Sequence, residues 1–113
     1  MKNLFFFLLK VAVVTGGSRG IGEMIAAGYL ANGAKVYISS RKAEACIATS
    51  ERLMKEYGGE CFAIPADLSS LEGINVFTEE FSKREPKLDI LVNNAGVAWG
   101  APLGEFPEIG WDK

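Results

Sequence analysis

The chain has 113 residues, of which 49% are hydrophobic and 23% charged, and its formal net charge is −2. This balance is typical of an ordinary globular domain, and it excludes a basic nucleic-acid-binding protein because 12 Lys and Arg residues nearly cancel 14 Asp and Glu residues. No histidine is present, which excludes Ser-His-Asp and Cys-His catalysis and every metal site built on histidine.

The apolar runs and the cysteines indicate the compartment. No apolar run reaches the roughly 18 residues of a membrane-spanning helix, so no membrane partner is expected. Cys46 and Cys61 lack CxxC spacing and predict small buried hydrophobes in a reducing, cytoplasmic compartment. Residues 4–9 could begin a secretory signal, but this run of six stops at Lys10 and no small-x-small cleavage site follows it. We expect it to lead into a buried strand.

Short apolar runs alternate along the chain with longer segments of helical periodicity, as in βαβ units around a parallel sheet. The expected strands are residues 10–15, 36–39, 61–65 and 88–93. Helices are expected over 21–31, over 43–57, and from a Ser69/Glu72 capping box to just before Pro86. Another helix is expected to begin within 106–113, where no stop signal follows, so the fold is predicted to be truncated after its fourth strand.

The helical periodicity also predicts which side chains face the sheet. In the first helix Met24 and Ile25 continue the apolar side of Ile21. The corresponding sets are Cys46, Ile47, Ser50, Leu53, Met54 and Tyr57 in the second helix, and Leu71, Ile74, Phe77 and Phe81 in the third.

A glycine-rich turn joins the first strand directly to the first helix, with the sequence Thr15-Gly16-Gly17-Ser18-Arg19-Gly20-Ile21-Gly22. Such a turn presents backbone N–H groups and the positive end of a helix dipole to an anion, and its glycines let a pyrophosphate approach the backbone. The alternative is a tight turn without a ligand. Strand, turn and helix in this order favour a nucleotide site.

Three motifs together resemble the short-chain dehydrogenase/reductase family. The turn has the spacing TGxxxGxG, Asn93-Asn94-Ala95-Gly96 ends the fourth strand as NNAG, and Asp67-Leu68 follows the third strand. The resemblance implies a Rossmann-type doubly wound parallel sheet of the α/β class with strand order 3-2-1-4. It also implies adenine contacts at Asp67 and Leu68 and an NNAG segment against the cofactor ribose. The alternatives are a turn or cap role for Asp67 and turn chemistry for the asparagines.

The end of the second strand predicts the cofactor. An acidic residue about 20 positions after the glycines is typical of NAD sites, whereas an arginine accommodates the 2′-phosphate of NADP. Here the sequence is Ser39-Ser40-Arg41, without a carboxylate, and Arg19 lies within the glycine turn. Both positions match basic residues of NADP-preferring relatives, so NADP(H) is expected. Alternatively, both arginines are solvated surface charges.

The family's catalytic Ser, Tyr and Lys have no counterpart in this chain. Four residues after Tyr29, Tyr37 and Tyr57 stand Gly33, Arg41 and Cys61, so no YxxxK motif is present. We therefore expect no catalytic residues, and expect residues 1–113 to form part of a dinucleotide-binding domain.

Within the family, several segments are similar to 3-oxoacyl-acyl-carrier-protein reductases of the rhamnolipid-biosynthesis type, including the runs 64–70 and 99–103. This implies NADPH-dependent reduction of an acyl or other carbonyl substrate by the full-length enzyme, and full-length relatives that are homo-oligomers. The alternatives are a catalytically inactive dinucleotide-binding protein and an unstable gene fragment.

Overall fold

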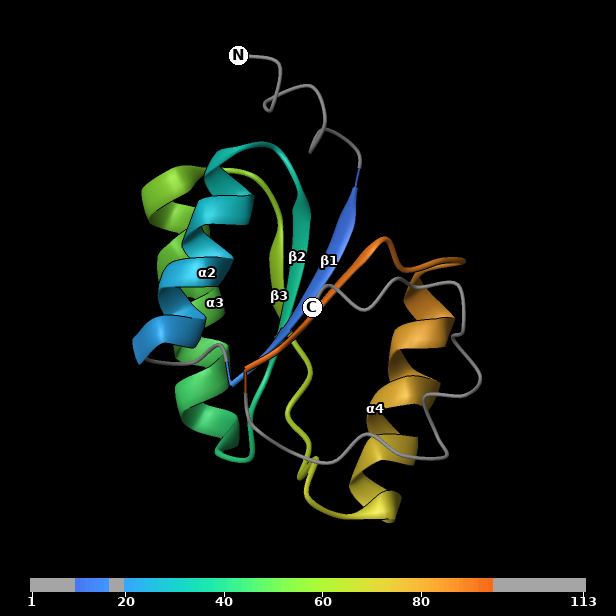
Figure 1. Ribbon diagram of the computed structural model, residues 1–113. Helices are drawn as coiled ribbons and strands as arrows, with labels where there is room; N and C mark the ends of the chain where they lie inside the picture. Colours follow the sequence, from blue (N-terminus) through green and yellow to red (C-terminus); the bar gives the residue numbers. More distant parts are fainter. Residues whose placement is uncertain (1–9, 17–19, 95–113) are drawn as a thin grey trace.

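The computed structural model of the chain describes residues 10–16 and 20–94, which form a four-stranded parallel sheet of order β3-β2-β1-β4 (Figure 1). The strands are β1 (Val11–Thr15), β2 (Lys35–Ser39), β3 (Cys61–Ala63) and β4 (Ile90–Asn93). The helices are α2 (Gly20–Ala31), α3 (Ala43–Tyr57) and α4 (Leu71–Arg84). Helices α2 and α3 cover one face of the sheet and α4 covers the other (Figure 1), which confirms the predicted Rossmann-type doubly wound fold.

The central strands are covered on both faces because their side chains are apolar in both directions. All five residues of β1 are buried. Val14 and Ile38 pack with Leu30 on the α2 and α3 side, whereas Val13 and Tyr37 pack on the α4 side. Continuous burial explains why an uninterrupted apolar run predicted this strand correctly.

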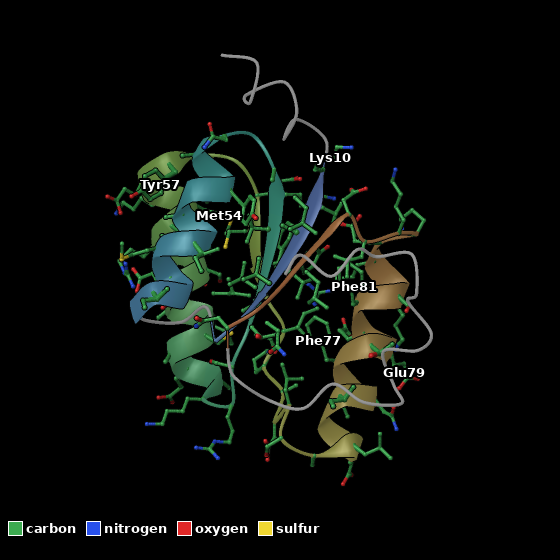
Figure 2. All side chains as sticks on the ribbon, viewed as in Figure 1. Lys10, Met54, Tyr57, Phe77, Glu79 and Phe81 are labelled. Atoms are coloured by element: carbon green, nitrogen blue, oxygen red, sulfur yellow. The ribbon has the colours of Figure 1, made fainter. Side chains whose placement is uncertain are left out.

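The α4 side of the core is aromatic. Phe77 and Phe81 point from α4 toward the sheet, and Glu79 points away from it (Figure 2). The ring of Phe81 meets that of Tyr37 edge to face, with 5.1 Å between the centroids. Each fully buried side chain of this size stabilises the fold by about 1.5–3 kcal/mol, so these contacts fix α4 on the sheet.

Strand boundaries differ from the prediction by up to two residues. β3 ends at Ala63 rather than at Pro65, whose ring nitrogen has no hydrogen to donate to a neighbouring strand. β4 begins at Ile90, two residues later than expected. Just before it, the Asp89 carboxylate accepts a hydrogen bond from the Val11 N–H at 2.8 Å, so a side chain closes this end of the strand pair.

The predicted sheet-facing side of α2 is wrong for two of its three residues. Ile21 is 68% exposed and Met24 is 71% exposed, while Ile25 packs partly buried against the core. The residues of α2 that are buried are Gly22, Ala26 and Leu30. Since nearly every residue of α2 is apolar, periodicity alone does not define its buried side, and small side chains let the helix lie close to the sheet.

The sheet-facing residues of α3 and α4 are mostly predicted correctly, because charged residues on the outer sides of these helices define the pattern. Cys46, Ser50 and Leu53 of α3 are buried, and so are Ile74, Phe77 and Phe81 of α4. The predicted residues that are exposed instead are Ile47, Tyr57 and Leu71.

Both cysteines are buried and unpaired, as predicted. Burial raises the pKa of both thiols, and that of Cys61 reaches about 12. They therefore stay protonated at neutral pH and act as core residues. Among the described residues, no helix is long and apolar enough to span a bilayer.

Candidate functional site

The strand order reverses beside β1. From β1 the chain moves to β2 and then to β3 on one side, and it then crosses to β4 on the other side of β1. In open α/β sheets the crevice outside the carboxyl ends of the strands at such a switch point is the usual ligand site. The residues at this edge come from four places in the sequence, at the ends of β1, β2, β3 and β4.

Hydrogen bonds join the ends of β1 and β4. Thr15 and Asn93 are paired in register. The hydroxyl of Thr15 lies 3.2 Å from Oδ1 of Asn93 and 3.3 Å from the Val92 carbonyl oxygen, and it donates toward both. The Asn94 side-chain amide donates to the Gly16 carbonyl across a long 3.5 Å contact. The described parts of the two family motifs, Thr15-Gly16 and Asn93-Asn94, thus lie together although they are far apart in the sequence.

Gly22 makes the closest approach between α2 and this unit. A Cβ at this position would lie 2.0 Å from the Gly16 carbonyl oxygen and 2.7 Å from Nδ2 of Asn94. No side chain fits there without displacing the turn. By contrast, Gly20 has a φ of +64°, and a Cβ on it would meet none of the described residues within 4 Å. The start of α2 is therefore open at this position, and a helix N-terminus attracts anions.

Ser39, Ser40 and Arg41 continue from the end of β2 at the same edge. The Ser39 hydroxyl donates a hydrogen bond to the Ile64 carbonyl at 2.7 Å. The Ser39 carbonyl accepts a hydrogen bond from the Gly16 N–H at 2.8 Å. The Oγ of Ser40 is buried next to the buried Cys46 thiol, whose pKa is raised by burial although a hydrogen bond with Ser40 acts to lower it. Arg41 is exposed, so its side chain is open to solvent.

The loop after β3 places Asp67 at this edge and Leu68 in the core. Asp67 accepts hydrogen bonds at Oδ1 from the backbone N–H and the hydroxyl of Ser69. These bonds, with a smaller contribution from the charge of Arg41, lower the pKa of Asp67. The side chain of Leu68 is buried on the α4 side, so its backbone is the part that a ligand could reach.

The cap of α4 is Ser70, so the prediction of a Ser69/Glu72 capping box is wrong. The Ser70 hydroxyl accepts the Gly73 N–H at 3.0 Å, because the Ser69 hydroxyl is already bonded to Asp67. Gly73 lets the helix approach this loop, since a Cβ there would lie 1.7 Å from the Asp67 carbonyl oxygen.

The structure brings together nine of the thirteen predicted site residues at or beside one edge of the sheet: Gly16, Gly20, Ile21, Gly22, Arg41, Asp67, Leu68, Asn93 and Asn94. Ser18, Arg19, Ala95 and Gly96 lie outside the described residues, as do the predicted elements in 4–9 and 106–113. Sequence reasoning gave no role to two residues that shape the site, Thr15 and Gly73. Thr15 is a polar residue that ends an apolar strand, and Gly73 is a glycine inside a helix. Both patterns can be recognised in the sequence and could have indicated these positions.

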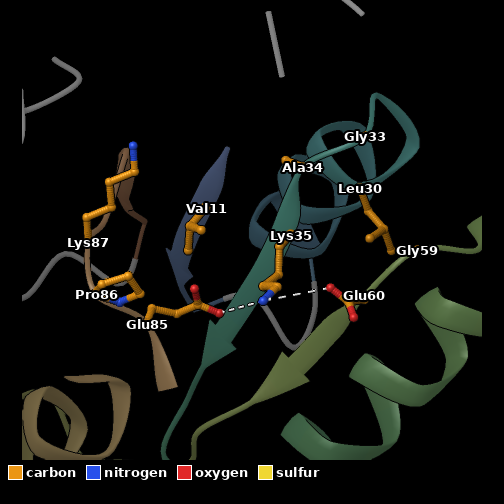
Figure 3. A pocket seen from close by; sticks show the side chains of 10 residues that line it. All are labelled: Val11, Leu30, Gly33, Ala34, Lys35, Gly59, Glu60, Glu85, Pro86 and Lys87. Carbon is orange, nitrogen blue, oxygen red and sulfur yellow. Dashed lines mark hydrogen bonds and ion pairs between the residues drawn. The ribbon is translucent and has the colours of Figure 1, made fainter. Parts of the chain in front are cut away.

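A cavity of about 460 Å³ lies elsewhere, at the amino ends of the strands (Figure 3). There Lys35 stands between two carboxylates, with Nζ 2.8 Å from Glu85 and 3.8 Å from Glu60. Tyr37 also donates to Glu85, at 2.7 Å. This cavity is on the edge opposite the glycine turn, and its charged groups are already paired, so it is separate from the candidate site.

A doubly wound sheet with a glycine turn at its switch point defines the class, a Rossmann-type α/β protein. The family model for the short chain dehydrogenases matches residues 10–113. The chain therefore belongs to the short-chain dehydrogenase family, whose members are oxidoreductases.

Relatives in this family share high identity over nearly all of the chain. The rhamnolipids biosynthesis 3-oxoacyl-[acyl-carrier-protein] reductase of Pseudomonas aeruginosa is 53% identical over 113 residues, which is 100% of this chain and 43% of that protein. The solved complex of Pseudomonas aeruginosa RhlG with NADP is 46% identical, with a TM-score of 0.77, over 96% of this chain and 42% of the other.

A metagenomic short-chain oxidoreductase solved with NADP is 40% identical, with a TM-score of 0.73, over 88% of this chain and 45% of that one. The chain thus spans less than half the length of these relatives.

Proposed function

We propose that residues 1–113 are a cofactor-binding portion of an NADP(H)-dependent carbonyl reductase that acts on 3-oxoacyl thioesters in the cytoplasm. The observation that carries the proposal is the contact at the switch point between the two described ends of the glycine turn, Thr15-Gly16 and Gly22, and the asparagines Asn93 and Asn94. The relatives solved with NADP support the cofactor. The identity with the 3-oxoacyl reductase supports the substrate class.

The residues present fit this cofactor on structural grounds. The open space at Gly20 and the start of α2 suit a pyrophosphate. Arg41 is exposed at the end of β2, and its guanidinium suits a 2′-phosphate. Residues 39–41 contain no carboxylate, so no negative charge in this segment repels the phosphate.

We assign roles to the chain's own residues accordingly. The backbone of Gly16, Ser18, Gly20, Ile21 and Gly22 would hold the pyrophosphate, and Arg19 and Arg41 the 2′-phosphate. Asp67 and Leu68 would contact the adenine, and Asn93, Asn94, Ala95 and Gly96 would line the ribose. When bound, NADP(H) supplies hydride-transfer chemistry, and these residues bind and orient it.

Titration of the 113-residue chain with NADPH and NADH tests the cofactor assignment. We expect NADPH to bind more tightly, and Arg41→Ala to weaken NADPH binding about tenfold or more, since a hydrogen bond to a charged group contributes about 1.5–3 kcal/mol. NADH affinity should change little. Lys42→Ala, at the adjacent exposed position, is the control. Tighter NADH binding, or equal losses for both cofactors, would refute the role of Arg41.

A second candidate is a protein that binds the cofactor without catalysis. The observation that favours it is that no tyrosine of the chain is followed by lysine four residues later, because hydride transfer to a carbonyl also needs proton delivery. This candidate predicts NADPH binding with no oxidation of NADPH on addition of a 3-oxoacyl thioester. Measurable turnover by the 113-residue chain would exclude it.

A further inference from the structure

The outward side of α2 differs from the outward sides of the other two helices. The exposed residues of α2 are all uncharged, namely Gly20, Ile21, Met24, Gly28 and Ala31. Exposed positions of α3 include Glu44, Glu51 and Lys55, and those of α4 include Glu79 and Lys83. Helices that cover a sheet normally carry charge on the side that faces water, so the α2 surface is unusual within its own fold.

This surface points directly away from the sheet. Met24 is two residues from both Gly22 and Ala26, and Gly28 is two residues from both Ala26 and Leu30. A step of two residues turns a helix by about 200°, so Met24 and Gly28 lie opposite the buried side. Further strands and helices of a doubly wound fold extend the sheet and its two helical layers sideways, so they leave the outer side of α2 uncovered.

The four residues 21, 24, 28 and 31 have the alternating spacing of three and four that forms a seam between two helices. The seam is bulky in its first half, where Ile21 and Met24 are 68% and 71% exposed. It is flat in its second half, where Gly28 has no neighbour within 4 Å of a Cβ position. In an antiparallel pair related by a twofold axis, the bulky half of each helix meets the flat half of the other.

From this self-complementarity we infer that the outer side of α2 is a docking surface for a second copy of this chain, with Met24 of each copy seated over Gly28 of the other. The partner surface is expected to be uncharged, because the four residues of the seam carry no charge. One pair of 12-residue helices buries less than the roughly 800 Å² per partner of a standard interface, so the dimer is weak.

Sedimentation of the 113-residue chain at rising protein concentrations, up to about 1 mM, tests the inference. The chain should shift from monomer to dimer, and Met24→Lys should remain a monomer. Val76→Lys, at a 51% exposed position on α4, is the matched control and should dimerise like the unchanged chain. A monomer throughout the range, or an undiminished dimer in Met24→Lys, would overturn the inference. The readout is the oligomeric state in the absence of NADPH, so this outcome is independent of the proposed function.

Cross-linking tests the orientation of the helices. A variant with both Met24→Cys and Gly28→Cys should form a disulfide-linked dimer when the thiol oxidant diamide is added, whereas each single variant should not, because residue 24 faces residue 28 of the other copy. Cys46 and Cys61 are buried and give no background. Efficient cross-linking of Met24→Cys alone would show a parallel pair and overturn the proposed arrangement.

Discussion

Gly22 determines how closely α2 lies to the glycine turn. Its missing side chain leaves room for the Gly16 carbonyl and the Asn94 amide. Gly22→Ala should lower the free energy of unfolding by about 1–3 kcal/mol, as overpacking does in a close-packed site, and should weaken NADPH binding because the turn must move. Urea unfolding and NADPH titration measure the two effects.

Gly28→Ala is the matched control for this substitution, since it makes the same change in the same helix at an open position. In dilute solution it should raise stability by about 0.5–1 kcal/mol, because alanine loses less conformational freedom than glycine in a helix. NADPH affinity should not change. If both variants behaved alike, helix propensity would explain the effect and the close approach at Gly22 would not.

At the scale of elements, the end of α4 is tied to β2 through Glu85, whose side chain is 7% exposed. Glu85→Gln should lower the free energy of unfolding by about 1–3 kcal/mol at neutral pH, because the hydrogen bonds from Lys35 and Tyr37 lose a charged acceptor. The exposed pair of Glu80 with Arg84 offers a control, since Glu80→Gln should cost less than about 0.5 kcal/mol. Urea unfolding of both variants decides whether burial makes this difference.

The same carboxylate predicts a dependence of stability on pH. Burial acts to raise the pKa of Glu85, but the hydrogen bonds from Lys35 and Tyr37 outweigh burial and lower it. A lowered pKa in the folded state stabilises the fold at neutral pH, and this contribution is lost as the pH falls through the folded pKa, below about 4.3. The stability difference between the unchanged chain and Glu85→Gln should therefore shrink in acid. Urea unfolding between roughly pH 7 and 3 measures it, and a constant difference would contradict this account.

At the scale of the whole molecule, NADPH should stabilise the folded chain, because a ligand that binds only the folded state adds about 2.7 kcal/mol at a hundred times its Kd. The Tm, followed by circular dichroism, should rise by roughly 10 °C. The same concentration of NADH should give a smaller rise, and Arg41→Ala should reduce the difference between the two cofactors. Equal shifts with both cofactors would argue against a 2′-phosphate site.

The element types followed from the sequence by itself, because the strands buried on both faces are uninterrupted apolar runs and α3 and α4 carry charges along one side only. The sequence also identified the glycine turn between β1 and α2 and the NNAG motif at the end of β4, since their residue types and spacing are specific. The position of α4 on the opposite face followed from the resemblance to the family.

Only the tertiary structure decided which side of α2 is buried, because that depends on how closely the helix lies to the sheet. Gly22, Ala26 and Leu30 face inward, and at Gly22 a Cβ would already lie 2.0 Å from the Gly16 carbonyl oxygen, so no larger side chain fits at that position. The position of the α4 cap at Ser70 is instead a local effect, because the Ser69 hydroxyl bonds to Asp67 two residues earlier. A periodic pattern predicts the buried side of a helix only when the other sides are polar. In α2 nearly every side is apolar, so the close approach to the neighbouring backbone determines which side is buried.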